Sequence, residues 1–156
     1  MERREFIALL GIAAAAMPSA ASAAPKFAAD SLAGQLVGTW SFASSVNTRK
    51  DGTTFDRWGA NPRGIFMFDR GGHYSQIIVG SESRVLGAKT FCAFGTYSVN
   101  EENKVLVMHI EASSSAPLAG TSQNRASIFL TATEMKYSNS VTAIGAIAEV
   151  LCKRVA

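Results

Sequence analysis

The chain has 156 residues, and 15 Lys and Arg residues against 12 Asp and Glu residues give it a net charge of +3 at pH 7. This mild excess is spread along the sequence without a basic run, so we expect no nucleic-acid partner. A hydrophobic fraction of 47% and the length left after a predicted leader indicate one globular domain, with no sign of its oligomeric state.

Residues 1–23 are predicted to be an export leader. Arg3-Arg4 precedes an apolar stretch over about 6–17, and Ala21-Ser22-Ala23 has the A-x-A form of a cleavage site, which places the cut near Ala23. The stretch is too short to stay in a membrane as a spanning helix, which needs about 20 residues, so no stable membrane anchor is expected. The paired arginines resemble a twin-arginine signal, although ordinary secretory signals also carry such pairs. The predicted location is periplasmic or secreted, with the export machinery as the partner of the leader.

The rest of the chain is predicted to form strands. A mobile lead-in is expected over 24–33, and Asp30 or Ser31 can cap a short helical turn over 32–36. The polar loop 80–89 is long enough to cover an opening. Short strands with turn signals between them indicate a β-sandwich or β-barrel, and no helix-period segment favours an α/β fold. The strands are expected at 38–46, 53–57, 65–68, 73–79, 90–99, 105–111, 125–131, 135–138 and 146–155.

Five groups of residues occur in order along 34–156. They are Leu36-Val37-Gly38-Thr39-Trp40, the Pro-x-Gly, apolar strand and Gly turn of 61–72, Phe94-Gly95-Thr96-Tyr97, Gly120-Thr121 with Arg125, and Lys153-Arg154. Together they resemble the bacterial lipocalin-like domain family, which consists of calycin-type barrels. The resemblance implies a single up-and-down antiparallel β-barrel of about eight strands, with a lumen that can hold one small ligand. The chain departs from the family pattern at Cys152, where an aromatic residue is usual, and at Met108, where a His is common.

The resemblance also implies a structural floor at one end of the barrel. In such barrels the Trp of the Gly-x-Trp motif, here Trp40 after Gly38, packs at the closed end. An Arg from the last strand, here Arg154, then lies over the Trp ring. A guanidinium group over an indole ring is favourable by about 0.5–2 kcal/mol. We therefore expect these three residues to be structural.

Side-chain alternation assigns further residues to the lumen. Trp40 fixes the phase of the first strand, so Phe42 and Ser44 should share its face. Arg125, at the start of a strand beside a long loop, can meet a ligand carboxylate at the rim, or else form a surface salt link. The other predicted lumen residues are Phe66, Phe68, Tyr74, Gln76, Ile78, Phe94, Met108 and Ile110. This mostly apolar lining suits a small apolar or amphipathic ligand, unless the side chains fill the barrel.

The remaining reactive side chains form no catalytic pattern. The chain has two cysteines, Cys92 and Cys152, and an even number of cysteines in an exported protein permits a disulfide. Their strands are not neighbours in an up-and-down barrel, so two separate buried thiols are the alternative. His109 and Glu111 share a strand face, but a metal site usually needs three or four ligands. We predict no catalytic residue, no metal and no cofactor.

The leader and the barrel together predict an exported protein that binds or carries a small apolar or amphipathic molecule in its lumen. Two other functions stay open. A lumen-based isomerase or cyclase would need a buried His, Glu, Asp or Arg beside its substrate. A ligand-free structural or interaction barrel would show a large exposed apolar patch on its outer wall.

Overall fold

The computed structural model describes residues 26–81, 89–139 and 145–155. The predicted leader at 1–23, its cleavage site and most of the loop expected to cover an opening lie outside the described residues. The elements are α1 (Leu32–Leu36), β1 (Gly38–Thr48), β2 (Thr54–Asp56), β3 (Arg63–Phe68), β4 (His73–Val79), β5 (Thr90–Asn100), β6 (Val105–Ser113), a 3-10 helix η1 (Ala116–Leu118), β7 (Ser122–Leu130), β8 (Glu134–Asn139) and β9 (Ile147–Arg154).

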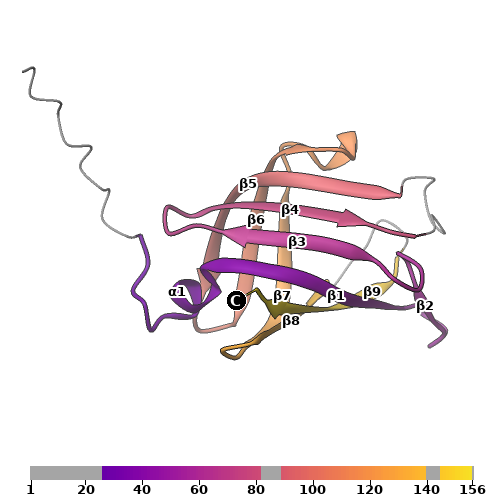
Figure 1. Cartoon of the computed structure of the whole chain (residues 1–156), viewed down its shortest axis with the longest axis horizontal. Coiled ribbons are helices and arrows are strands. Elements are labelled where there is room, and N and C mark those ends of the chain that lie inside the picture. Colours follow the sequence, from indigo (N-terminus) through magenta and orange to yellow (C-terminus); the bar gives the residue numbers. More distant parts are fainter. Residues whose placement is uncertain (1–25, 82–88, 140–144, 156) are drawn as a thin grey trace, which may run out of the picture.

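Eight of these strands close into an antiparallel barrel, which confirms the predicted all-β, up-and-down architecture (Figure 1). From β3 to β9 each strand pairs with the next one in sequence, and β1 closes the ring by pairing with both β3 and β9. The short β2 is an additional strand, which pairs with the C-terminal end of β1. Side chains therefore alternate between the barrel interior and its outer wall along each strand.

The alternation is interrupted by β-bulges at three places along the described strands. The register shifts between Phe42 and Ser44 where β1 meets β9, between Phe94 and Gly95 where β5 meets β6, and between Ala126 and Phe129 where β7 meets β8. An extra residue bends its strand and increases the local twist, which helps a sheet to close. It also reverses the phase of every side chain beyond it.

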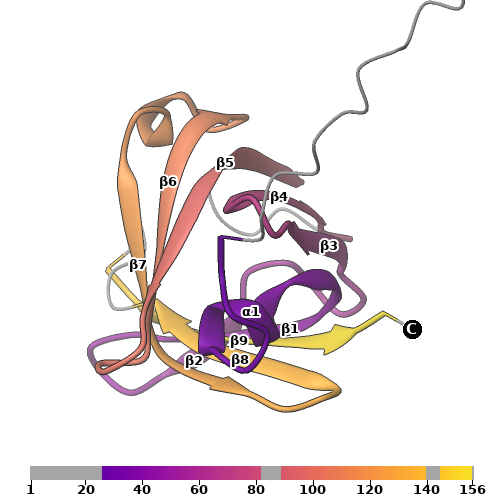
Figure 2. The ribbon, with the colours of Figure 1, turned by 90° about the vertical axis from the view of Figure 1, so that its left-hand side faces the viewer.

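Helix α1 lies across one end of the barrel (Figure 2). The Ser31 hydroxyl caps it by accepting a hydrogen bond from the backbone N–H of Gly34 at 2.9 Å. The carboxylate of Glu101, in the turn after β5, accepts from the backbone N–H groups of Leu32 and Ala33 at 2.9 and 3.0 Å. Leu36 at the end of the helix is fully buried. The helix thus plugs this end of the interior.

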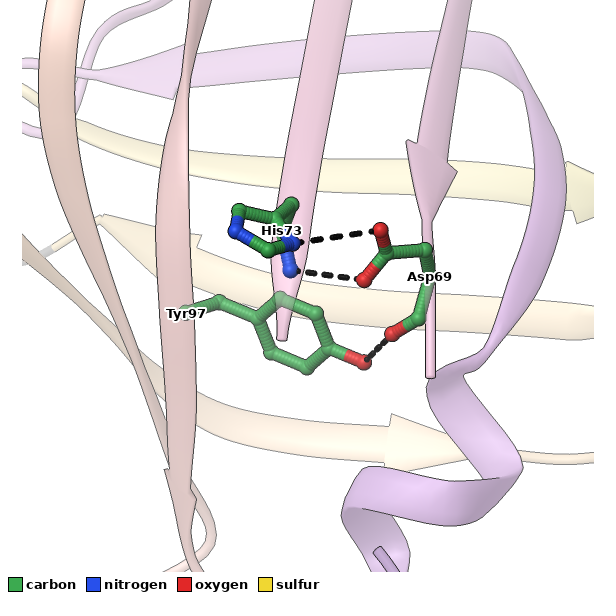
Figure 3. Close-up of polar contacts among 3 residues, drawn as sticks. All are labelled: Asp69, His73 and Tyr97. Atoms are coloured by element: carbon green, nitrogen blue, oxygen red, sulfur yellow. Dashed lines mark hydrogen bonds and ion pairs between the residues drawn. The ribbon is translucent and has the colours of Figure 1, made fainter. Parts of the chain in front are cut away.

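The turn between β3 and β4 is tied to β5 (Figure 3). The Tyr97 hydroxyl donates to the Asp69 carbonyl oxygen at 2.8 Å, and the Asp69 carboxylate accepts from the His73 backbone N–H at 2.8 Å. The Asp69 carboxylate also lies 3.2 Å from Nδ1 of His73, and both side chains are largely exposed. In the predicted lead-in, the Lys26 backbone N–H donates to the Arg70 carbonyl at 3.0 Å. These contacts fasten the turn and the entering chain to the barrel.

Trp40 forms the floor of the interior beside α1. Its ring is completely buried, and its Nε1 donates to the Leu36 carbonyl at 2.8 Å. The guanidinium of Arg154, from β9, lies over the ring with Cζ 4.0 Å from the ring centroid. Gly38 has a φ of +131°, and a Cβ at this position would lie 2.8 Å from Nη1 of Arg154. The structure thus places Gly38, Trp40 and Arg154 together at the plugged end.

Candidate functional site

The barrel interior is divided into a packed half and an open half. The half next to α1 is filled by large buried side chains, among them Trp40, Phe66, Phe68, Leu106, Met108 and Met135. At the opposite half, which we call the mouth half, the interior contains a cavity of about 350 Å³. At about 30 Å³ per water molecule this is room for roughly a dozen waters, and it lies in the size range of small-molecule sites.

The wall of the cavity combines apolar surface with polar groups. Its apolar residues are Phe42, Trp58, Ile78, Phe91, Pro117, Leu118, Ala148 and Val150. Its polar residues are Ser45, Asn47, Arg57, Gln76, Ser115, Gln123, Arg125, Tyr137 and Asn139. Small-molecule sites typically combine apolar and aromatic surface with polar groups that fix the orientation of the ligand, and this wall offers both kinds of side chain.

Three side chains of this wall carry a buried polar atom that no described residue satisfies. They are Oε1 of Gln76, Nε of Arg125 and Oδ1 of Asn139. Asn139 stands directly opposite Arg125 across the β7–β8 pair, and Gln76 comes from β4 on another side of the barrel. Leaving a buried polar atom without a partner costs about 1–3 kcal/mol, so such atoms usually bind a protein group, a water or a ligand. They give the cavity unused hydrogen-bonding capacity.

Arg125 is a buried cation inside the lumen. Its side chain is only 7% exposed, and its Cζ lies 5.8 Å from the centroid of the Tyr137 ring. The ion pairs among the described residues join Asp69 to His73 and Glu134 to Lys136, and neither involves Arg125. The neighbouring hydroxyls do not neutralise it either, because burial raises the pKa of Tyr137, and burial raises that of Tyr74 to about 12. Both phenols are therefore uncharged at pH 7.

A second guanidinium stands at the cavity wall. Arg57 has its Cζ 4.9 Å from the centroid of the Trp58 ring, and burial lowers the pKa of its side chain. Of the described residues that line the cavity, none is an Asp, a Glu or a His. The described wall thus carries two cations without an acidic side chain. A lumen-based isomerase or cyclase would need a buried His, Glu, Asp or Arg beside its substrate. Of these four residue types, only Arg is found among the described lining residues.

The structure brings most of the predicted lumen residues into the interior, but only some of them reach the cavity. Phe42, Gln76, Ile78 and Arg125 line it. Phe66, Phe68, Tyr74, Met108 and Ile110 are buried and are not among the cavity-lining residues. The expectation that large side chains fill the barrel therefore describes one half of the lumen, and the expectation of a ligand space describes the other half.

Two predicted lumen residues face outward. Phe94 is 53% exposed, because β5 has the opposite phase and turns Ala93 and Tyr97 inward instead. A one-residue error in phase exchanges the two faces of a strand. Ser44 lies in a groove on the outer wall, since the bulge that follows Phe42 turns Ser45 inward in its place. The lumen assignments of Phe94 and Ser44 are wrong.

Arg125 is also placed differently from its prediction. The sequence suggested a rim position or a surface salt link, whereas the side chain is buried within the lumen. Ser122 and Gln123, which precede it, already belong to β7, so the strand begins earlier than predicted and carries Arg125 below the rim. The inward position follows from this longer strand.

Three aromatic residues of the cavity wall were missed by the sequence reasoning. Trp58 follows β2 in a segment that reads as a loop, and a large aromatic residue in such a loop is itself a signal of burial. Phe91 shares the inward phase of Ala93, so the correct phase of β5 would have found it. Tyr137 lies on a correctly predicted strand whose phase the sequence leaves open.

The disulfide considered for Cys92 and Cys152 is absent, because both cysteines are free. Cys92 stands opposite Ile77 on the outer wall, and Cys152 is fully buried opposite Phe42 in the interior. The barrel wall therefore separates the two thiols. Burial raises the pKa of the Cys152 thiol to about 12, so it is uncharged at neutral pH.

The outer wall carries another groove, separate from the one beside Ser44, and we call this one the outer groove. It has a volume of about 300 Å³ and is lined by Ile77, Cys92 and Phe94, among others. Ile77 and Phe94 are both exposed. The outer groove is apolar surface on which a hydrophobic probe can also adsorb, so it must be distinguished from the cavity in any binding experiment.

The described residues contain neither a metal-binding cluster nor a membrane-spanning helix. No group of three or more His, Cys, Asp or Glu side chains is placed there to hold a metal ion. No helix in the described part of the chain has the length and hydrophobicity needed to cross a bilayer.

Comparison with known proteins gives a distant likeness of fold. No protein-family model and no curated protein matches the chain. Among the solved structures, the chain is similar to a de novo designed fluorescence-activating β-barrel, with a TM-score of 0.47 and 15% sequence identity. The match covers 79% of this chain and 96% of that chain.

Proposed function

We propose that this protein is an exported binding or carrier protein, which holds a small apolar or amphipathic molecule in the mouth half of its barrel. One observation carries the proposal. A cavity of about 350 Å³ lies inside the barrel, and its wall presents buried polar atoms of Gln76, Arg125 and Asn139 that no described residue satisfies. A barrel that only needed to be stable would gain by packing this half as it packs the other.

Export is supported by the sequence of the leader. Arg3-Arg4, the apolar stretch and Ala21-Ser22-Ala23 have the order and lengths of a signal peptide. Membership of the lipocalin-like family is part of the same proposal, and the Gly38, Trp40 and Arg154 floor supports it.

The experiment is a titration of the purified protein with N-phenyl-1-naphthylamine, a neutral probe whose fluorescence rises in apolar surroundings. Phe91 and Phe94 provide a matched pair, because they lie on opposite faces of β5. We expect Phe91→Ala to weaken binding of the probe at least several-fold and Phe94→Ala to leave it unchanged. Ala148→Phe, which puts a ring into the cavity, should abolish binding.

The reverse pattern would place the probe in the outer groove and overturn the proposal. So would the failure of the wild-type protein to bind the probe at all. Circular dichroism and thermal unfolding of each variant show that the barrel is intact. If Ala148→Phe does not fold, the Phe91 and Phe94 pair decides the question alone.

A further inference from the structure

We infer that the molecule held in the cavity is an organic acid, with its carboxylate at Arg125 and its apolar body against Trp58 and Phe91. The inference rests on the proposed function and names the chemical class of the ligand. It is drawn from the charge of the cavity, from the position of Arg125 and from the size of the space.

The charge of the cavity favours an anion. Arg57 and Arg125 both stand at its wall, and no described lining residue is acidic. A buried charge is normally paired, because removing an ion from water is costly. Within the described part of the chain Arg125 has no acidic partner within 4 Å, and the raised pKa values of Tyr74 and Tyr137 keep these neighbours uncharged. A ligand anion would supply the missing countercharge.

The free donor of Arg125 favours a carboxylate. Nε of the guanidinium is buried without a described partner. Nε and the adjacent Nη form the edge of the guanidinium that binds the two oxygens of a carboxylate in parallel. The unsatisfied oxygens of Gln76 and Asn139 can accept from a hydroxyl or N–H group elsewhere on the same ligand.

The rest of the cavity favours a compact apolar body. Trp58, Phe91 and Ile78 line the same cavity as Arg125 and offer it two aromatic rings and an aliphatic side chain. The volume of about 350 Å³ lies at the lower end of the range of small-molecule sites, so a bicyclic aromatic acid or a medium-chain fatty acid has a suitable size. A ligand of this kind satisfies Arg125 and covers the apolar wall at once.

The test compares two probes of the same shape, 2-naphthoate and 2-naphthamide, by isothermal titration calorimetry at pH 7. A hydrogen bond to a charged group contributes about 1.5–3 kcal/mol, which corresponds to a factor of roughly 10 to 150 in affinity. We expect the wild-type protein to bind 2-naphthoate at least about tenfold more tightly than 2-naphthamide, with the neutral probe N-phenyl-1-naphthylamine displaced by both.

Variants of Arg125 test whether this residue causes the preference for 2-naphthoate over 2-naphthamide. Arg125→Met should remove most of the preference for 2-naphthoate and change the affinity for 2-naphthamide by less than about threefold. Arg125→Lys should retain part of the preference, because it keeps the charge and loses the planar fork. Arg63→Met removes one positive charge from an exposed position and should leave the preference unchanged.

The outcomes separate the two proposals. Equal affinities for the two naphthalene probes, in a protein that still binds N-phenyl-1-naphthylamine in the lumen, would overturn the inference and leave the proposed function standing. Failure of all three probes to enter the lumen would overturn both. If neither Arg125 variant folds, the comparison of the two probes on the wild-type protein remains decisive.

Discussion

Arg154 and Trp40 hold the first and last strands together, with the guanidinium of Arg154 on β9 lying 4.0 Å from the centre of the Trp40 ring on β1. The same guanidinium donates to the carbonyl oxygen of Gln35, in the last turn of α1, at 2.6 Å and to that of Val37, between α1 and β1, at 3.0 Å. Arg154 thus links the β1–β9 strand pair, helix α1 and the Trp40 floor. The stability of the barrel should depend strongly on it.

The first prediction concerns the floor itself. Replacing Trp40 by Ala empties a completely buried aromatic site, which usually costs about 3–5 kcal/mol of folding free energy. Urea unfolding followed by far-ultraviolet circular dichroism should show a loss of this size. A loss below about 1 kcal/mol would mean that the ring is not part of a core.

The second prediction concerns the glycine beside this contact. Gly38→Ala should destabilise the protein because φ is +131° and because the new Cβ would lie 2.8 Å from Nη1 of Arg154. Gly120→Ala is the matched control, since φ there is +76° and the space is open. Each positive φ costs about 1–3 kcal/mol for a non-glycine residue, and only Gly38→Ala adds the steric conflict. Equal losses of unfolding free energy in the two glycine variants would contradict the proposed steric conflict. So would a loss from Gly38→Ala that is just as large when Arg154 is also replaced by Ala.

The third prediction is a fall in stability at alkaline pH. Burial raises the pKa of Cys152 from 9.0 to about 12, so the folded state keeps a proton that the unfolded state releases. The stabilisation is complete below pH 9 and is lost as the pH rises toward 12, by up to about 1.4 kcal/mol per pH unit for one proton. Urea midpoints measured at several pH values should fall over this range, and less steeply in Cys152→Ala. An unchanged slope in that variant would show that the thiol is not responsible.

The fourth prediction concerns export. Substituting Lys for both Arg3 and Arg4 should abolish export if the leader uses the twin-arginine route. Fractionation of cells that express the wild-type and the double variant, followed by immunoblotting, gives the distribution of the protein. Undiminished exported protein in the double variant would exclude this route and favour an ordinary secretory signal.

The strands were predictable from the sequence because turn residues separate short segments of high β propensity. The floor was predictable through the resemblance of Gly38, Trp40 and Arg154 to a known pattern. Each predicted strand is present, and the helical turn at Leu32–Leu36 has the predicted bounds. Local composition and spacing are sufficient for this level of structure.

The facing of individual side chains was less predictable. On β1 the bulge after Phe42 adds a residue, and nothing in the sequence marks it, so Ser44 and Ser45 exchange roles. On β5 apolar residues occupy both faces, and Phe94 is as hydrophobic as Phe91, so composition cannot choose the phase. Only the pairing with neighbouring strands decides it. The division of the lumen into a packed half and a cavity likewise depends on how side chains from all strands meet.

The most direct test of the central claim is a crystal structure of the protein grown with N-phenyl-1-naphthylamine. We expect the probe to lie inside the barrel, in contact with Trp58 and Phe91. A probe found on the outer wall between Ile77 and Phe94, with the lumen closed to it, would contradict the claim that this barrel is a container.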